Sequence, residues 1–323
     1  IDILIINRSD EFLNEYISPY AERLKYITNF TGSAGKAIVL QKEAYLYVDG
    51  RYTFQAQEQI NKNEIIPKHL NLFWDDLKKY ISNQNCKIAV DPKLHSIKEI
   101  QKIQEYIFNT SSSIKFLESN IIDTIWTNKP VIEYSNIFDH PIKFAGYDRE
   151  KKLDDFSEFL QNKNIDHYLV TGLDNIAWLL NIRADDILYT PLLFSYLLIS
   201  KNSKSSLYIN TDKIDEKLKF ELQKNVEIYS INKIENIFSN LRDDETVGLD
   251  FSTTTYFFLN LLEKNNIRYK DVANPIILSK AIKNKIEQTG AINANLRDGV
   301  SVTRFIYWLK NEMDINLTSE LSA

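Results

Sequence analysis

The sequence predicts an α/β protein made of two copies of one domain, each a mixed sheet flanked by helices. At about 100 to 200 residues per domain, its 323 residues correspond to two domains and part of a third. Strand-like runs rich in Ile, Val and Tyr alternate with charged amphipathic segments, which is the pattern of a sheet covered by helices. Four short segments of the first half also recur in the second half in the same order, roughly 150 to 160 residues later, which indicates an internal duplication.

The elements expected in the first copy follow from apolar periodicity. Helices are predicted where apolar residues recur at four-residue spacing, as Phe73, Leu77 and Ile81 do. Short runs of β-branched and aromatic residues between turn signals are predicted to be strands. These rules give strands at 3–6, 37–40, 44–48 and 87–90, and helices at 53–60, 72–81 and 97–108.

The second copy follows a segment with Pro130 and Pro141, which we interpret as a linker. The segments that match between the copies are 26–29 with 178–181, 37–40 with 194–199, 44–48 with 207–209, and 88–91 with 247–250. After Pro275, Ser279 is predicted to cap a helix that continues to Leu309. The expected units are domain one at 1–127, the linker at 128–145, domain two at 146–273, and the start of an incomplete third unit at 274–323.

Charge and hydropathy argue against nucleic acid and membrane partners. Lys and Arg number 39 against 44 Asp and Glu, so the net charge of −5 provides no basic surface for phosphates. The longest apolar run, 187–199, is interrupted by polar residues and is shorter than the ~20 residues that a membrane span needs. Cys86 is the one cysteine, so no internal disulfide forms, and a cytoplasmic location is expected.

No metal or cofactor site is expected in this chain. The four histidines stand singly, without the His-x-x-x-His or His-Glu-x-x-His spacing of a metal site: His69, His95, His140 and His167. The loop at 30–37 lacks the spacing and the hydroxyl residue of a Walker A loop, and no Gly-x-Ser-x-Gly motif surrounds Ser33. We therefore assign no catalytic residue and no metal ligand here.

The segment Tyr47-Val48-Asp49-Gly50-Arg51-Tyr52 is the one feature that could carry chemistry. A tight Asp-Gly turn at the end of a strand can project the following side chain, Arg51, out of the sheet. Its planar guanidinium could bind a peptide carbonyl or carboxylate through two N–H groups, with Asp49 fixing its orientation. From spacing alone, a surface arginine that follows a turn remains the alternative.

These residues resemble the N-terminal part of cytosolic-type Xaa-Pro aminopeptidases, also called aminopeptidases P. The matching strings follow the family's order across nearly the whole chain. They are Asn14-Glu15-Tyr16, Phe30-Thr31-Gly32-Ser33-Ala34-Gly35-Lys36-Ala37, Asp49-Gly50-Arg51-Tyr52-Thr53-Phe54-Gln55-Ala56, Ala177-Trp178-Leu179-Leu180-Asn181-Ile182-Arg183, Pro191-Leu192-Leu193-Phe194-Ser195-Tyr196, Asn274-Pro275-Ile276 and Lys280-Ala281-Ile282-Lys283-Asn284.

The resemblance implies two creatinase-type N-terminal domains followed by a pita-bread catalytic domain, of which 274–323 would be the beginning. It also implies that the intact enzyme removes the residue that precedes proline at a peptide's N-terminus, and that it forms a homodimer. Two divalent metal ions, usually manganese, would be held there by two Asp, one His and two Glu and would activate a bridging hydroxide. We expect all five ligands to lie beyond Ala323.

The resemblance aligns Arg51 with the arginine through which the first domain reaches substrate in this family. Asp49 and Tyr52 are expected to support Arg51 rather than to touch substrate, and Arg183 is expected to make a structural or interdomain contact. Two other interpretations stay open. One is a non-catalytic binding or scaffold protein with the same paired domains, and the other is a prolidase- or creatinase-like hydrolase, whose relatives usually carry one such domain.

Overall fold

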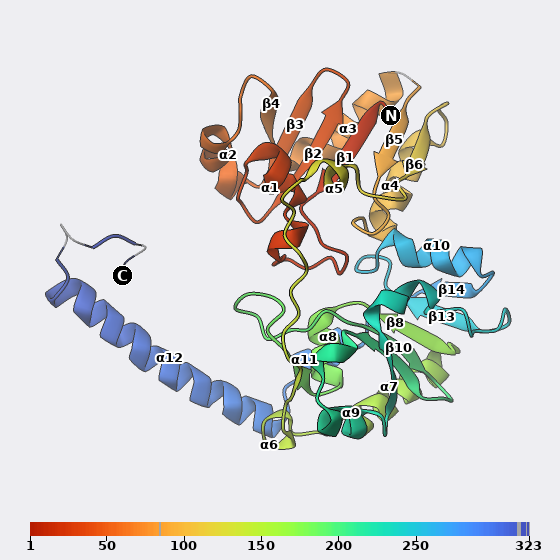
Figure 1. Ribbon diagram of the computed structural model, residues 1–323, viewed down its shortest axis with the longest axis vertical. Coiled ribbons are helices and arrows are strands. Elements are labelled where there is room, and N and C mark those ends of the chain that lie inside the picture. The colour runs from red at the N-terminus through yellow and green to blue at the C-terminus, as the bar shows by residue number, and fades with distance from the viewer. Residues whose placement is uncertain (84, 315–317, 321, 323) are drawn as a thin grey trace.

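The computed structural model describes residues 1–83, 85–314, 318–320 and 322. They form two domains, each built on a six-stranded sheet, and a long helix that extends away from the second domain (Figure 1). The two sheets lie one after the other along the chain, so each domain is continuous in sequence. None of the helices in the described part of the chain is long and apolar enough to cross a membrane.

The first domain is a mixed sheet with helices on both faces. Its strands follow the order β4-β3-β2-β1-β5-β6, in which the β1–β2 and β2–β3 pairs are antiparallel and the other neighbours are parallel. The helices α3 and α4 pack on one face, and α1, α2 and α5 on the other. The elements are β1 (Ile3–Asn7), η1 (Pro19–Ala21), α1 (Arg23–Thr28), β2 (Gly35–Leu40), β3 (Ala44–Val48), η2 (Gly50–Tyr52), α2 (Thr53–Gln59), β4 (Ile65–His69), η3 (Leu70–Leu72), α3 (Phe73–Asn83), β5 (Lys87–Val90), α4 (Ile97–Ile107), β6 (Ser113–Phe116) and α5 (Ile121–Ile125).

The second domain repeats this topology. Its sheet has the order β12-β11-β10-β8-β13-β14, with antiparallel and parallel pairs at the same places as in the first domain. Two short strands, β7 and β9, form a separate antiparallel pair. The elements are β7 (Phe138–Asp139), α6 (Ile142–Ala145), α7 (Arg149–Lys163), β8 (His167–Val170), α8 (Leu173–Leu179), β9 (Ile182–Arg183), β10 (Tyr196–Ser200), β11 (Ser205–Ile209), η4 (Thr211–Lys213), α9 (Glu216–Leu222), β12 (Val226–Ser230), η5 (Ile231–Asn236), β13 (Thr246–Leu249), α10 (Tyr256–Lys264) and β14 (Arg268–Asp271).

The strand register confirms the predicted duplication. In the first sheet Ile3 pairs with both Leu40 and Ile88, and in the second sheet His167 pairs with both Ser200 and Val247 at the corresponding places. The four sequence matches between the copies are therefore structural equivalents. Even the residues that end α1 and follow α8 agree, because Asn29 and Asn181 both have a positive φ, 61° and 52°.

The predicted start of the last helix is wrong. Ser279 lies inside a short helix, α11 (Ile276–Ala281), and the long helix α12 (Lys285–Asn311) begins only after a turn. Asn284 is its N-cap: the Asn284 side chain accepts hydrogen bonds from the backbone of Ile286 and Glu287, and Glu287 accepts one from the Asn284 backbone. This reciprocal capping box satisfies N–H groups that a helix start otherwise leaves without partners.

The two domains are joined through the starts of two helices. The first backbone N–H groups of α4, at Ile97 and Lys98, donate to the carbonyl oxygens of Thr254 and Phe251 in the second domain at 3.0 Å each. In return, the first N–H groups of α10 donate to carbonyl oxygens of the first domain, Tyr256 to His95 and Phe257 to Pro92, at 2.9 Å each. Because helix starts have no partners of their own for these groups, each domain completes the other's helix.

An aromatic cluster fills the rest of the interface. Phe12 of the first domain stacks on Phe194 and Tyr196 of the second, with ring centroids 5.1 and 4.7 Å apart. Tyr20 meets Phe194 edge to face at 5.9 Å. One continuous hydrophobic core therefore includes residues of both sheets.

Phe12 is placed by a buried carboxylate. Asp10 accepts hydrogen bonds from the backbone of Phe12 and Asn14 and from the Asn14 side chain, at 2.9 to 3.1 Å. Burial raises the pKa of Asp10 to about 6, against the opposing effect of these hydrogen bonds. The segment that presents Phe12 to the second domain is thus fixed by its own local polar contacts.

We expect Phe194→Ala to lower the free energy of unfolding by about 3 to 5 kcal/mol, because Phe194 is only 2% exposed and its removal leaves a cavity between the domains. Phe108→Ala is the control: Phe108 is 82% exposed, so the change should be about 0.5 kcal/mol or less. Urea unfolding, followed by tryptophan fluorescence and far-UV circular dichroism, measures both. The shared core predicts one transition, and two separate transitions in the unmodified protein would contradict it.

Candidate functional site

Arg51 lies in η2, which follows β3 after Asp49. Asp49 caps this turn: its Oδ1 accepts hydrogen bonds from the backbone N of Arg51 at 3.1 Å and from its Nε at 2.7 Å. The Arg51 side chain is nevertheless 71% exposed, and within the described residues its two terminal nitrogens have no hydrogen-bond partner. The guanidinium is therefore held at one edge and open at the other.

Charge pairing supports this arrangement. The hydrogen bonds from Arg51 hold the pKa of the Asp49 carboxyl below its ordinary value, and Asp49 in turn raises the pKa of Arg51. Both groups are therefore ionised at neutral pH. An exposed pair of this kind contributes little to stability, so its effect is mainly on the direction of the guanidinium.

Tyr52 forms the wall beside Arg51. The guanidinium carbon lies 5.3 Å from the centre of the Tyr52 ring, and the ring meets Phe30 edge to face at 5.8 Å. The Tyr52 hydroxyl lies 2.6 Å from Ser33 Oγ, and this contact lowers the pKa of Tyr52. The loop at 30–37, called the glycine loop below, thus supports the Arg51 turn. It needs a glycine at position 32 because a Cβ on Gly32 would lie 2.2 Å from the Phe30 ring.

Arg8 ties the neighbouring segments to this loop. Its Nη1 donates to the carbonyl oxygens of Glu15 and Ser33, both at 3.1 Å, and its Nη2 donates to Glu22 at 2.9 Å. These bonds join β1, the segment before η1 and the glycine loop into one surface next to Arg51. The matched strings at 14–16, 30–37 and 49–56 therefore meet in space.

The Arg51 surface presents groups that can bind a ligand. In the part of the chain that the structure describes, no three His, Cys, Asp or Glu side chains come together as a metal site. The histidines have separate local partners, such as Asp91 O for His95 and Ser200 for His167. Burial raises the pKa of Cys86, so it is a poor nucleophile. The chemistry available at Arg51 is the binding of a carbonyl or carboxylate group.

Arg183 binds backbone carbonyl groups. Its Nη1 donates to the carbonyl oxygens of Ala177 and Ile182 at 2.6 and 2.9 Å, within its own domain. It therefore ties the end of α8 to β9.

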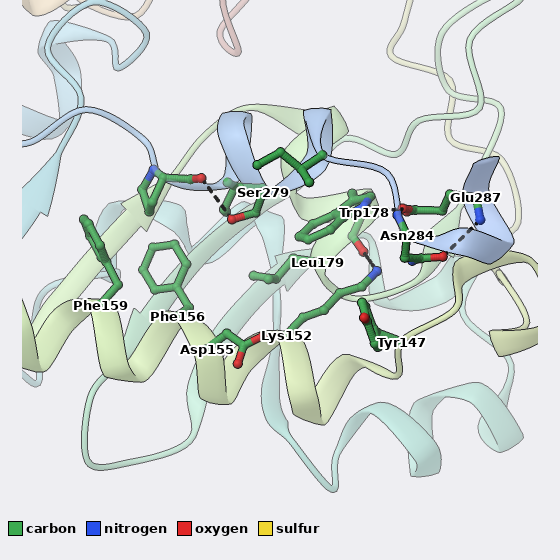
Figure 2. Close-up of a pocket in the computed structure, with 13 residues that line it drawn as sticks. Tyr147, Lys152, Asp155, Phe156, Phe159, Trp178, Leu179, Ser279, Asn284 and Glu287 are labelled. Carbon is green, nitrogen blue, oxygen red and sulfur yellow. Dashed lines mark hydrogen bonds between the residues drawn. The ribbon is translucent and has the colours of Figure 1, made fainter. Parts of the chain in front are cut away.

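Sequence reasoning missed a second hollow, of about 290 Å³, between α7, α8 and the joint of α11 with α12 (Figure 2). Lys152 and Trp178 line it on the domain side, and Asn284 and Glu287 on the side of α12. One feature of the sequence could have indicated this pocket. Lys152 is a charged residue at four-residue spacing from Phe156 and Leu160, so it lies on the apolar face of α7.

The two repeated domains correspond to a known class of protein domain. The sequence matches the Creatinase/Prolidase N-terminal domain over residues 1–121 and again over residues 128–287. The chain therefore belongs to the creatinase/prolidase N-terminal domain family and carries two such domains.

Particular relatives make the likeness more specific. The chain is 32% identical to a probable Xaa-Pro aminopeptidase P of Blastomyces gilchristii, over 97% of this chain and 53% of that protein, and 31% identical to one of Coccidioides posadasii, over 97% and 50%. The solved X-prolyl aminopeptidase of Caenorhabditis elegans, described as a cytosolic enzyme with a di-nuclear active site, superposes with a TM-score of 0.90 at 27% identity, over 97% of this chain and 52% of that one. The chain spans about half the length of the curated relatives it matches.

We expect Asp49→Ala to release the Arg51 guanidinium while leaving the domain folded. The Nε–H of Arg51 would lose its acceptor, so its exchange with water should become severalfold faster. A ¹⁵N-edited NMR measurement of arginine Nε–H groups tests this. Asp244→Ala is the matched control because Asp244 also binds the Nε of an exposed arginine, Arg242, at 3.1 Å. Equal Arg51 exchange in the two variants would show that Asp49 does not hold the side chain.

Proposed function

We propose that this chain is the N-terminal, non-catalytic region of a metal-dependent Xaa-Pro aminopeptidase, and that Arg51 binds the peptide substrate. The observation that carries the proposal is a guanidinium that Asp49 holds at Nε while both terminal nitrogens face solvent. The likeness to an X-prolyl aminopeptidase over 97% of the chain supports it.

Arg51 is suited to bind the part of a peptide that extends out of a neighbouring catalytic centre. Proline has no backbone N–H and a fixed φ, so a peptide with proline in second position presents its following carbonyl groups in a restricted direction. The two terminal nitrogens of Arg51 can donate to one such carbonyl or to a terminal carboxylate. Asp49 and Tyr52 then act by limiting the directions in which the guanidinium can point.

We propose that the metal centre lies in the half of the aminopeptidase relatives that this chain does not cover. Two divalent ions, which we propose to be manganese, would supply Lewis-acid activation and a hydroxide nucleophile there. The side chains described here do not fit such a centre, since no set of three potential ligands converges among them. The complete protein is proposed to act in the cytoplasm, as a homodimer, on peptides with proline in second position.

In the complete enzyme, we expect Arg51→Ala to lower kcat/KM for Xaa-Pro peptides by about ten- to a hundredfold, because one charge-assisted contact with the substrate is lost. The amount of bound metal should not change, since Arg51 is not a ligand. Steady-state kinetics and elemental analysis of the same preparation measure the two quantities.

The control for this experiment is Arg242→Ala. Arg242 is 72% exposed and is paired through its Nε with an aspartate, as Arg51 is, but it lies in the second domain. Its removal should leave kcat/KM within about twofold. Unchanged turnover in Arg51→Ala would remove the proposed role of Arg51, and a complete protein without peptidase activity would favour a binding or scaffold function.

A further inference from the structure

A ring of hydrogen bonds connects the second domain to the start of α12, and Figure 2 shows the part of it that includes Lys152, Trp178, Asn284 and Glu287. On the domain side, Lys152 Nζ donates to the carbonyl oxygen of Trp178 and to Asn181 Oδ1, both at 2.7 Å. Asn181 Nδ2 donates to the carbonyl oxygen of Tyr147 at 2.9 Å. The ring crosses to α12 where Trp178 Nε1 donates to Glu287 Oε1 at 3.0 Å.

The ring closes through the N-cap of α12. Glu287 Oε2 accepts the backbone N–H of Asn284 at 2.9 Å, and Asn284 Nδ2 donates to the carbonyl oxygen of Ala145 at 2.8 Å. Ala145 is connected to Tyr147 through Gly146, so the backbone completes the ring. The contact is close: Gly146 has φ +80°, and a Cβ on it would lie 2.4 Å from Asn284 Oδ1. A larger residue at this position would push the cap of α12 away from the domain.

Trp178 is the part of the ring that is held on three sides. Its carbonyl oxygen accepts from Lys152, its indole ring lies 4.1 Å from the same ammonium group, and its N–H reaches Glu287. Burial lowers the pKa of Lys152 to about 8, and the nearby Glu287 carboxylate opposes this shift. The indole is consequently fixed in the position that meets α12.

Most residues of α12 are exposed, and its main contact with the two domains is with α6. Among the described residues, its side chains form hydrogen bonds to the domains only through Glu287. Large apolar residues along it are exposed, among them Ile292, Leu296 and Val300, and Figure 1 shows the helix extending away from the second domain. At 1.5 Å per residue, its 27 residues are about 40 Å long, so a 10° change at the joint moves the far end by about 7 Å.

The geometry points to Trp178 and Glu287 as a lock that fixes the direction of α12 relative to the paired domains, and thereby positions Arg51 relative to the catalytic region that follows α12. This inference rests on the proposed function. Trp178 and Glu287 are positioning residues: they lie in the second domain and at the joint, and act on the substrate only through the placement of Arg51. Since misplacement of a contact by about 1 Å can cost a hundredfold in rate, a 7 Å lever movement is ample.

The test uses the complete protein and two variants that open the ring from opposite sides. Trp178→Phe keeps an aromatic ring over Lys152 but removes the N–H to Glu287, and Gly146→Ala displaces Asn284. Trp74→Phe is the control, because it is the same substitution at an indole whose N–H has no partner among the described residues. Hydrogen exchange followed by mass spectrometry should show at least tenfold faster exchange at 284–290 in both variants and no change in the control.

A double-mutant cycle then separates positioning from a merely structural effect. Trp178→Phe should lower kcat/KM for Xaa-Pro peptides by about tenfold in the unmodified background and by less than twofold in the Arg51→Ala background, because it acts through Arg51. Equal losses in both backgrounds, or unchanged exchange at 284–290, would overturn the lock. If Arg51→Ala alone has no effect, the proposed function fails instead, and the exchange measurement still decides whether the joint is locked.

Discussion

The exchange of backbone hydrogen bonds between the starts of α4 and α10 is the contact on which the arrangement of this protein depends. Each helix begins with N–H groups that cannot be paired inside the helix, and here each pair finds its acceptors in the other domain. Breaking the interface would leave these groups without partners while also exposing the rings of Phe12 and Phe194. The two domains are therefore held as one body, although each has its own sheet.

A rigid pair of domains gives the Arg51 surface a fixed relation to the joint of α12. The glycine loop and the bonds of Arg8 place the turn that carries Arg51 at one end of this body. The ring through Trp178, Glu287 and Asn284 lies on the second domain, at the start of α12. Together, the Arg51 surface and the ring at the start of α12 fix the direction of one guanidinium and the direction of one helix.

The sequence was sufficient for the elements whose residues are buried on a regular period. The strands β3 and β5 have the predicted bounds, 44–48 and 87–90, and four short matches between the halves predicted the repeat of the first domain in the second. The edge strands β4, β6, β12 and β14 were not predicted. The reason is physical, since β4 contains Pro67 and β14 is exposed along its whole length, so neither has the pattern of a buried strand.

The sites likewise combine features that the sequence predicted with features that it did not. The Asp-Gly turn and the charge of Arg51 were visible in the sequence, and the contact of Asp49 with the guanidinium follows from their spacing. Ser279 was the predicted N-cap of the last helix, although Asn284 and Glu287 have the three-residue spacing of a capping box. The ring around Trp178 could not be predicted, since it joins residues more than a hundred positions apart whose meeting depends on the packed domain.

The central claim, that this chain presents Arg51 to the substrate of an Xaa-Pro aminopeptidase, is tested most directly by a crystal structure of the complete protein. The crystals would contain a slowly cleaved peptide analogue with proline in second position. We expect a terminal nitrogen of Arg51 to lie within about 3.2 Å of a carbonyl or carboxylate oxygen of that peptide, with Asp49 still bound to Nε. A fully occupied peptide that leaves Arg51 in contact with solvent alone would contradict it.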